Sequence, residues 1–163
     1  MEAVMSIPTR LRSYLDQQGA RYEISAHDYS RSSAETARSA HVAPHQLAKS
    51  VILEDDKGCV MAVVPADKDV IVDEVADMLG RRELRLAKED RIATLFDDCE
   101  RGAIPPVGMA WGLETIVDDE LEDNESVYME GGDHKRLLMM SRAQFQALMG
   151  PAQHGRFCRP SLH

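Results

Sequence analysis

A lysine at the start of an apolar stretch is the first group in this sequence that could do chemistry. Lys49 opens the stretch that ends at Leu53, so its ammonium would stand at the rim of a buried strand, and it shares a strand face with Val51. A cation there could bind an anion or a carbonyl oxygen, although a lysine stem lying along apolar surface explains the pattern equally well. Ser50 follows directly and is a candidate for substrate binding.

The segment 97–112 is the second candidate, because it contains three glycines, two adjacent prolines and the only tryptophan. We expect an ordered loop here rather than a linker. The first part of the loop could present main-chain N–H groups to a developing oxyanion, and the two prolines, which have no N–H, would stiffen it. A plain connection with stiff turns is the alternative. The residues concerned are Gly102, Ala103 and Ile104 for the oxyanion, and Pro105 and Pro106 for the stiffening.

Histidines and cysteines give weaker indications. His134 follows the Gly131-Gly132 turn and could bind a substrate or relay a proton, but a solvated turn histidine fits the pattern as well. The three cysteines are far apart and form no CxxC motif, so we predict neither a disulfide framework nor a metal site. Cys99 lies among acidic residues that should raise the pKa of its thiol, and we expect it to be unreactive.

Composition restricts the class of protein. With 163 residues the chain has the length of one domain, and we expect a single domain over 1–163 with its core at about 20–150. The net charge of −9 argues against non-specific binding to nucleic acid, and we expect no DNA partner. No apolar stretch is long enough to span a membrane and no signal peptide is present, so we expect a cytoplasmic protein without a membrane partner.

The pattern of apolar residues predicts the elements that must position these groups. We expect an α+β fold, in which a mixed, mostly antiparallel curved sheet or barrel of about six or more strands is flanked by helices. The tail should be partly loose. Strands are expected at 21–25, 49–53, 59–65, 83–86, 114–118, 126–130 and 136–140, helices at 6–19, 32–41, 72–80, 88–96 and 141–150, and the tail at 151–163.

Several of these features resemble a known family when they are taken in order. They are Lys49 at the start of its strand, the strand end Val63-Val64-Pro65-Ala66, the loop from Gly102 to Pro106, the pair Val117-Asp118 and the Gly131-Gly132 turn. In this order they resemble the YbaK-like aminoacyl-tRNA deacylases, which are related to the editing domain inserted in bacterial prolyl-tRNA synthetases. The resemblance covers roughly residues 20–150.

The resemblance implies hydrolysis of the ester that joins a wrongly attached amino acid to the terminal ribose of a tRNA. It implies a free-standing enzyme without a cofactor, which acts on the acceptor end of aminoacyl-tRNA and removes a small residue such as alanine, serine or cysteine. A synthetase that recruits the enzyme is a further candidate partner. Lys49 would hold the carbonyl oxygen or the terminal phosphate, and a ribose hydroxyl or a water would complete the attack. Together with Pro105 and Pro106, His27 and Gly132 would flank the substrate.

Two other functions remain open from the sequence. One is a non-catalytic module with the same fold that binds an amino acid, a nucleotide or a tRNA end. The other is hydrolysis of a small acyl ester without tRNA. A lysine in the pocket suits each of these uses, so Lys49 alone does not discriminate between them.

Overall fold

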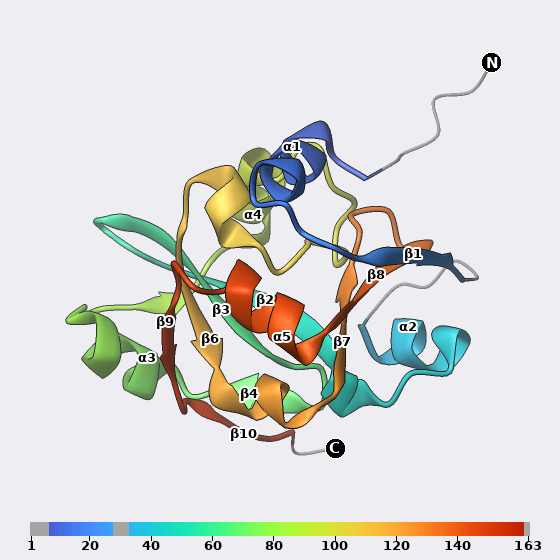
Figure 1. Cartoon of the computed structure of the whole chain (residues 1–163). Coiled ribbons are helices and arrows are strands. Elements are labelled where there is room, and N and C mark those ends of the chain that lie inside the picture. The colour runs from blue at the N-terminus through green and yellow to red at the C-terminus, as the bar shows by residue number, and fades with distance from the viewer. Residues whose placement is uncertain (1–6, 28–32, 162–163) are drawn as a thin grey trace.

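An open sheet forms the centre of the molecule (Figure 1). The computed structural model describes residues 7–27 and 33–161. Of its eight strands, seven follow the order β1-β8-β7-β2-β3-β6-β9, and the eighth, β5, pairs with β2 outside this path. The strands are β1 (Glu23–Ala26), β2 (Leu47–Asp55), β3 (Gly58–Pro65), β5 (Arg85–Leu86), β6 (Glu114–Asp118), β7 (Ser126–Glu130), β8 (Arg136–Ser141) and β9 (Gln153–Gly155). The sheet is mixed and mostly antiparallel, as expected, and it does not close into a barrel.

The central hairpin of β2 and β3 forms where the two apolar stretches were expected. The strands pair antiparallel from Ala48 opposite Pro65 to Asp55 opposite Gly58. Gly58 has a φ of 129°, which a residue with a side chain adopts only with strain, so the turn depends on this glycine. Both strands are largely buried because helices cover both faces of the sheet.

The two faces are covered by different helices. On one face, Ala48 and Ile52 of β2 pack in a cluster with residues of α1 (Thr9–Gln17) and α5 (Arg142–Leu148), and residues of α4 (Glu89–Leu95) pack against it. On the other face, Leu53 packs in a cluster with residues of α3 (Val72–Leu79). Leu47 lies on this second face as well, in a small cluster with Ala37 of α2 (Ser33–Ala40). Side chains of β2 therefore alternate between the two covers.

Helix ends follow the expected signals where the structure describes them. Gly80 ends α3 with a φ of 66°, and the Ser141 hydroxyl accepts a hydrogen bond from the Gln144 N–H at the start of α5. The expected capping residues Ser6 and Ser32 lie outside the described residues. No helix of the described residues is long and apolar enough to cross a membrane.

The expectation of a partly loose tail was wrong. Strand β9 pairs parallel with β6, and β10 (Cys158–Pro160) pairs antiparallel with β4 (Lys68–Val70). Between them Phe157 is buried at 1% exposure, and its N–H donates to Asp118 Oδ2 over 2.8 Å. Apolar burial and pairing with distant strands thus hold a segment whose local sequence shows little preference for a strand.

Candidate functional site

The candidate site lies along one edge of β2. On this edge β7 pairs with Leu47 and Ala48, and β5 pairs with Leu53 and Glu54. Between these two partners, the residues from Lys49 to Val51 pair with no strand of the described chain on this side. The predicted oxyanion loop occupies the interval, so the sheet is interrupted where the candidate residues cluster.

The loop is attached to the sheet on both sides. The Ser50 hydroxyl donates to the Ile104 carbonyl over 3.1 Å. Farther back, the Glu100 N–H donates to the Gly132 carbonyl over 2.8 Å, and a nitrogen of the His134 ring contacts the Arg101 carbonyl. The structure thereby brings together four of the predicted site residues. They are Ser50, Ile104, Gly132 and His134.

Of the three main-chain amides predicted to face an oxyanion, two remain available to a ligand. The Ala103 N–H already donates to the Glu100 carbonyl over 3.1 Å. The N–H groups of Gly102 and Ile104 make no hydrogen bond to another described residue. Gly102 is exposed and has a φ of 82°, a conformation that favours glycine. Pro105 and Pro106 are buried and anchor the end of the loop.

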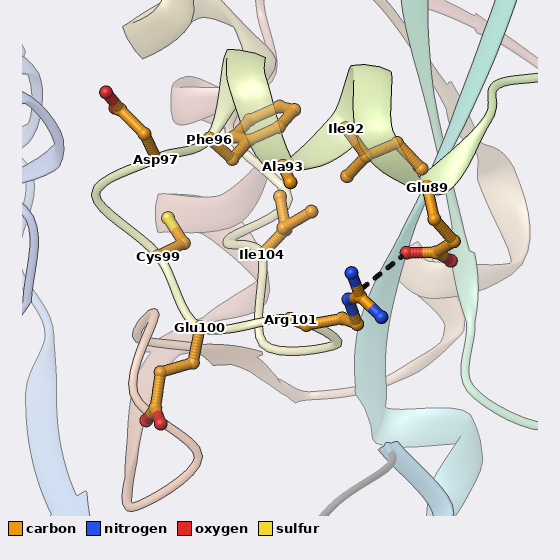
Figure 2. A pocket seen from close by; sticks show the side chains of 9 residues that line it. All are labelled: Glu89, Ile92, Ala93, Phe96, Asp97, Cys99, Glu100, Arg101 and Ile104. Atoms are coloured by element: carbon orange, nitrogen blue, oxygen red, sulfur yellow. Dashed lines mark ion pairs between the residues drawn. The ribbon is translucent and has the colours of Figure 1, made fainter.

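Two cavities border the loop, of about 300 Å³ and about 250 Å³. The larger lies between the loop and α4, where Phe96 and Ile92 lie above Ile104 (Figure 2). One side of it carries the ion pair between Arg101 and Glu89, at 3.6 Å, and both side chains are largely exposed. The smaller cavity is lined by Ser50, Gly102 and Ile104, among others. Mostly apolar hollows therefore flank the two available amides.

Lys49 faces away from Ser50. Neighbouring residues of a strand point to opposite faces, and Lys49 lies on the face of Leu47, which is covered by α2. Its ammonium donates to the Lys68 carbonyl over 2.6 Å. Burial lowers the pKa of Lys49, while the charges of Asp69 and Asp67 act in the opposite direction. The half-buried ammonium and Ser50 therefore flank the same edge of the sheet from two sides.

A buried glutamate at the end of β7 was not expected from the sequence. In the parallel pair of β2 and β7, Leu47 lies opposite Tyr128. Lys49 and Glu130 each lie two residues further along, so both point to the same face. Glu130 is 2% exposed, and neither carboxylate oxygen makes a hydrogen bond of ordinary geometry. Burial, with a smaller effect of Asp133, raises the pKa of Glu130 to about 7.

Sequence reasoning could have found Glu130 from one signal. An acidic residue ends an otherwise apolar strand and directly precedes two glycines. Such a residue is placed where a strand leaves the core, and its carboxyl group then lies close to the turn that follows. The strand pattern alone does not show which face is covered, and Glu130 was therefore not predicted.

The other predicted histidine and glycine positions surround the turn between β7 and β8. The N–H of His27 donates to the Lys135 carbonyl over 2.8 Å, so His27 lies beside this turn. Gly132 has a φ of 101°, and a Cβ atom there would lie 2.8 Å from Pro8. His134 is 2% exposed rather than solvated and has a φ of 61°. The turn is therefore tightly packed and fixes the loop that rests on it.

Cys99 and Trp111 take part in packing. Burial, followed by the Asp98 carboxylate, raises the pKa of the Cys99 thiol, which agrees with the expected lack of reactivity. The Trp111 ring packs tilted against Phe96 with centroids 5.1 Å apart, and its N–H donates to Asp98 over 3.2 Å. The Arg10 guanidinium lies over the same ring.

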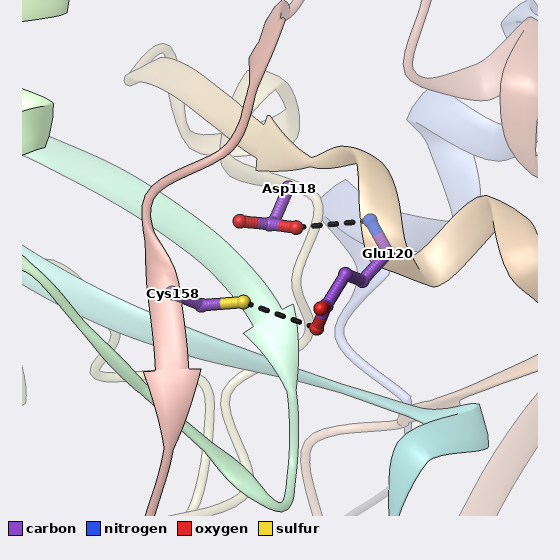
Figure 3. A group of neighbouring side chains, drawn as sticks. All are labelled: Asp118, Glu120 and Cys158. Carbon is purple, nitrogen blue, oxygen red and sulfur yellow. Dashed lines mark hydrogen bonds between the residues drawn. The ribbon is translucent and has the colours of Figure 1, made fainter.

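Three potential metal ligands gather near the end of β6 (Figure 3). The ligand atoms of Asp118, Glu120 and Cys158 lie within 4.8 Å of one another. Both Asp118 oxygens, however, accept main-chain N–H groups, from Glu120 and from Phe157, and the Cys158 thiol donates to Glu120 over 3.3 Å. These bonds tie β10 to the end of β6, and we assign the cluster a structural role.

Comparison of the sequence with models of known protein families identifies the family of this chain. Residues 27–148 match the model of the aminoacyl-tRNA editing domain. The chain belongs to this family. The resemblance seen in the sequence is therefore confirmed, and the candidate loop, Lys49 and Glu130 all lie inside the matched region of the editing domain. Among curated proteins, none matches the chain.

Solved structures share the fold of this editing domain. A candidate trans-editing enzyme for prolyl-tRNA synthetase has 22% identity and a TM-score of 0.79, over 92% of this chain and 95% of that chain. A scaffold protein for computational epitope grafting has 22% identity and a TM-score of 0.78, over 93% and 96%. A candidate signal transduction protein from Marinobacter aquaeolei VT8 has 22% identity and a TM-score of 0.72, over 93% of this chain and 30% of that chain.

Proposed function

We propose that this editing domain is a trans-acting deacylase, which hydrolyses the ester of a misacylated tRNA carrying alanine, serine or cysteine. The observation that carries the proposal is the loop at the interrupted edge of β2, which keeps the amides of Gly102 and Ile104 available. Membership of the editing-domain family supports it. The cytoplasm, where translation takes place, is the location that goes with this activity.

Ester hydrolysis at this loop needs little from side chains. The two amides would donate to the carbonyl oxygen as it becomes an oxyanion, and donors already fixed in place need no reorganisation during the reaction. Nucleophilic attack would come from a water or from the ribose hydroxyl next to the ester. The Ser50 hydroxyl already donates to the Ile104 carbonyl, and the Cys99 thiol is held protonated, so neither side chain is the proposed nucleophile.

The other predicted residues would hold the substrate or the loop. We assign Lys49 to the ester carbonyl or the terminal phosphate, which would replace the Lys68 carbonyl as the partner of the ammonium. Gly132 and His134 would act through the loop that they contact. His27, Pro105 and Pro106 complete the surroundings of the acceptor end. A synthetase that delivers the tRNA is the further candidate partner.

The test is release of amino acid from alanyl-, seryl- and cysteinyl-tRNA mischarged on proline and other acceptors. Lys49→Ala is compared with Lys57→Ala, because Lys57 is an exposed lysine in the turn after β2 and its loss should change nothing. We expect release well above spontaneous hydrolysis by the wild type and by Lys57→Ala, and its loss in Lys49→Ala. Survival of every ester in the presence of folded wild-type protein would refute the deacylase.

A non-catalytic binding module is the second candidate. The signal transduction protein from Marinobacter favours it, because the matching region is 30% of a longer chain with a different description. If no ester is hydrolysed, a rise in the melting temperature with amino acid, nucleotide or uncharged tRNA would support this module.

Digesting the tRNA moiety with ribonuclease before the assay would show whether a small acyl ester alone is sufficient for hydrolysis.

A further inference from the structure

Glu130 is a buried carboxyl group that has no positive partner among the described residues. It lies at 2% exposure with neither oxygen in a hydrogen bond of ordinary geometry. A carboxylate taken out of water costs several kcal/mol unless a cation or several donors compensate it. The pKa of Glu130 is shifted by its burial, by the Thr36 hydroxyl and by Asp133, and no cation of the described residues contributes to the shift. A site of this kind favours a positively charged ligand.

Asp133, the charged side chain that contributes to the pKa shift of Glu130, already has a partner. Asp133 pairs with Arg136, and its Oδ1 also accepts the N–H groups of Lys135 and Arg136, each over 2.9 Å. On the strand side, Glu130 lies opposite Leu137, which is fully buried in the cluster that includes Ala37 of α2. The carboxyl group is therefore bordered by apolar side chains on one side and a satisfied ion pair on the other.

The position of Glu130 relative to Lys49 suggests what the ligand is. Both side chains leave the same face of neighbouring strands, two residues beyond the pair of Leu47 and Tyr128. Lys49 offers a positive group and Glu130 a negative one, and neither contributes to the pKa shift of the other. The two therefore remain open to a ligand that has a polar oxygen next to a cation. An aminoacyl ester is such a ligand, because its α-ammonium group is one carbon away from the ester carbonyl.

We propose that Glu130 binds the α-ammonium group of the aminoacyl ester. This inference rests on the proposed deacylase function and adds to it a preference for a free amino group on the substrate. An ion pair there would supply the missing partner of the buried carboxylate. It would also fix the amino acid, so that the ester carbonyl has one defined position relative to Lys49.

Access to Glu130 requires α2 to move. Among the described side chains of this helix, the buried ones are Thr36 and Ala37, and both are small. Movement of α2 off the sheet would also expose Leu47 and Leu137, which are fully buried in the same cluster, so the apolar cost of opening comes mainly from these two leucines. The helix then covers the bound amino acid as it covers the carboxyl group in this structure.

The experiment compares two esters that differ only at the amino group. Aminoacyl-tRNA and its N-acetyl derivative are each treated with wild type, Glu130→Gln and Glu125→Gln, and kcat and KM are measured above spontaneous hydrolysis. Glu125 is an exposed glutamate just before β7 and serves as the matched control. We expect Glu130→Gln to lower kcat/KM for the free amine by about 10- to 100-fold, the size of a hydrogen bond to a charged group, and to leave the N-acetyl ester unchanged.

The outcomes separate this inference from the proposed function. If the wild type hydrolyses neither ester, both fail. If it hydrolyses the free-amine ester and Glu130→Gln keeps the same preference for the free amine, the role of Glu130 is refuted while the deacylase stands. The melting temperature of Glu130→Gln, compared with that of Glu125→Gln, reports whether the variant is folded. A folded Glu130→Gln that loses both activities equally would contradict a role confined to the ammonium.

Discussion

Replacement of Glu130 by glutamine should stabilise the protein, and the gain should depend on pH. The pKa of Glu130 is raised from 4.5 to about 7, so between these values the folded protein holds a proton that the unfolded chain releases. The contribution of Glu130 to stability is complete below pH 4.5 and is lost as the pH rises to 7. Glutamine has no proton to lose and stays neutral in both states.

The magnitude follows from the same pKa values. A difference of about 2.5 units corresponds to about 3 kcal/mol of unfolding free energy, because each unit is worth about 1.4 kcal/mol. The free energy of unfolding of Glu130→Gln should therefore equal that of the wild type near pH 4.5 and exceed it by about 3 kcal/mol at pH 8. Nearly all of the difference should arise between those two pH values.

Urea denaturation of wild type, Glu130→Gln and Glu125→Gln at pH values from 4.5 to 8 measures this difference directly. Glu125 is exposed, so its variant should follow the wild type throughout. Comparing variants at each pH cancels the titration of all other groups. A constant difference between Glu130→Gln and the wild type across this range would refute the argument, since a buried carboxyl with an ordinary pKa would give that result.

Two further predictions concern stability away from the site. The Arg81 guanidinium, whose Nε donates to Asp55 over 2.6 Å, lowers the pKa of Asp55, so the stabilisation is present at neutral pH and is lost as the pH falls below the ordinary value of 3.8. Asp55→Asn should therefore lower the urea midpoint at pH 6 and make that midpoint depend less on pH between 6 and 3. A variant whose midpoint falls with pH as steeply as that of the wild type would contradict this. Phe157→Ala should cost about 3 to 5 kcal/mol by leaving a cavity, and calorimetry showing a wild-type melting temperature would mean that Phe157 is not the anchor of β10.

Much of the sheet could be predicted because most of its strands are marked by apolar residues and by turn residues in the local sequence. Strands β6 and β7 have the bounds expected from their apolar residues and turns, and α3 ends at Gly80 as expected. Strands β9 and β10 could not be predicted, because each has three residues and is held by a partner far away in the sequence. Local sequence contains no information on such partners.

The candidate site could likewise be predicted only in part. The loop around Gly102 and the strand of Lys49 are local features, so composition and periodicity were enough to find them. Alternation along a strand also implies that Lys49 and Ser50 face opposite sides, which the structure shows. The surroundings of Glu130, by contrast, arise from the parallel pairing of β2 with β7 and from the helix that covers them, and both are contacts between distant segments.

The pairing of β10 with β4 links the last described segment of the chain to the candidate catalytic lysine. Pro160 lies opposite Lys68, whose carbonyl accepts the Lys49 ammonium. Ser161 donates through its N–H to the Asp67 carbonyl and through its hydroxyl to the Asp69 carboxylate, and these two aspartates are the ones that favour the charged lysine. A protein shortened before residue 153 would lose the strand that holds all three groups. Truncation or fusion at this end of the molecule therefore changes the electrostatic surroundings of Lys49, although Lys49 and β10 are more than 100 positions apart in the sequence.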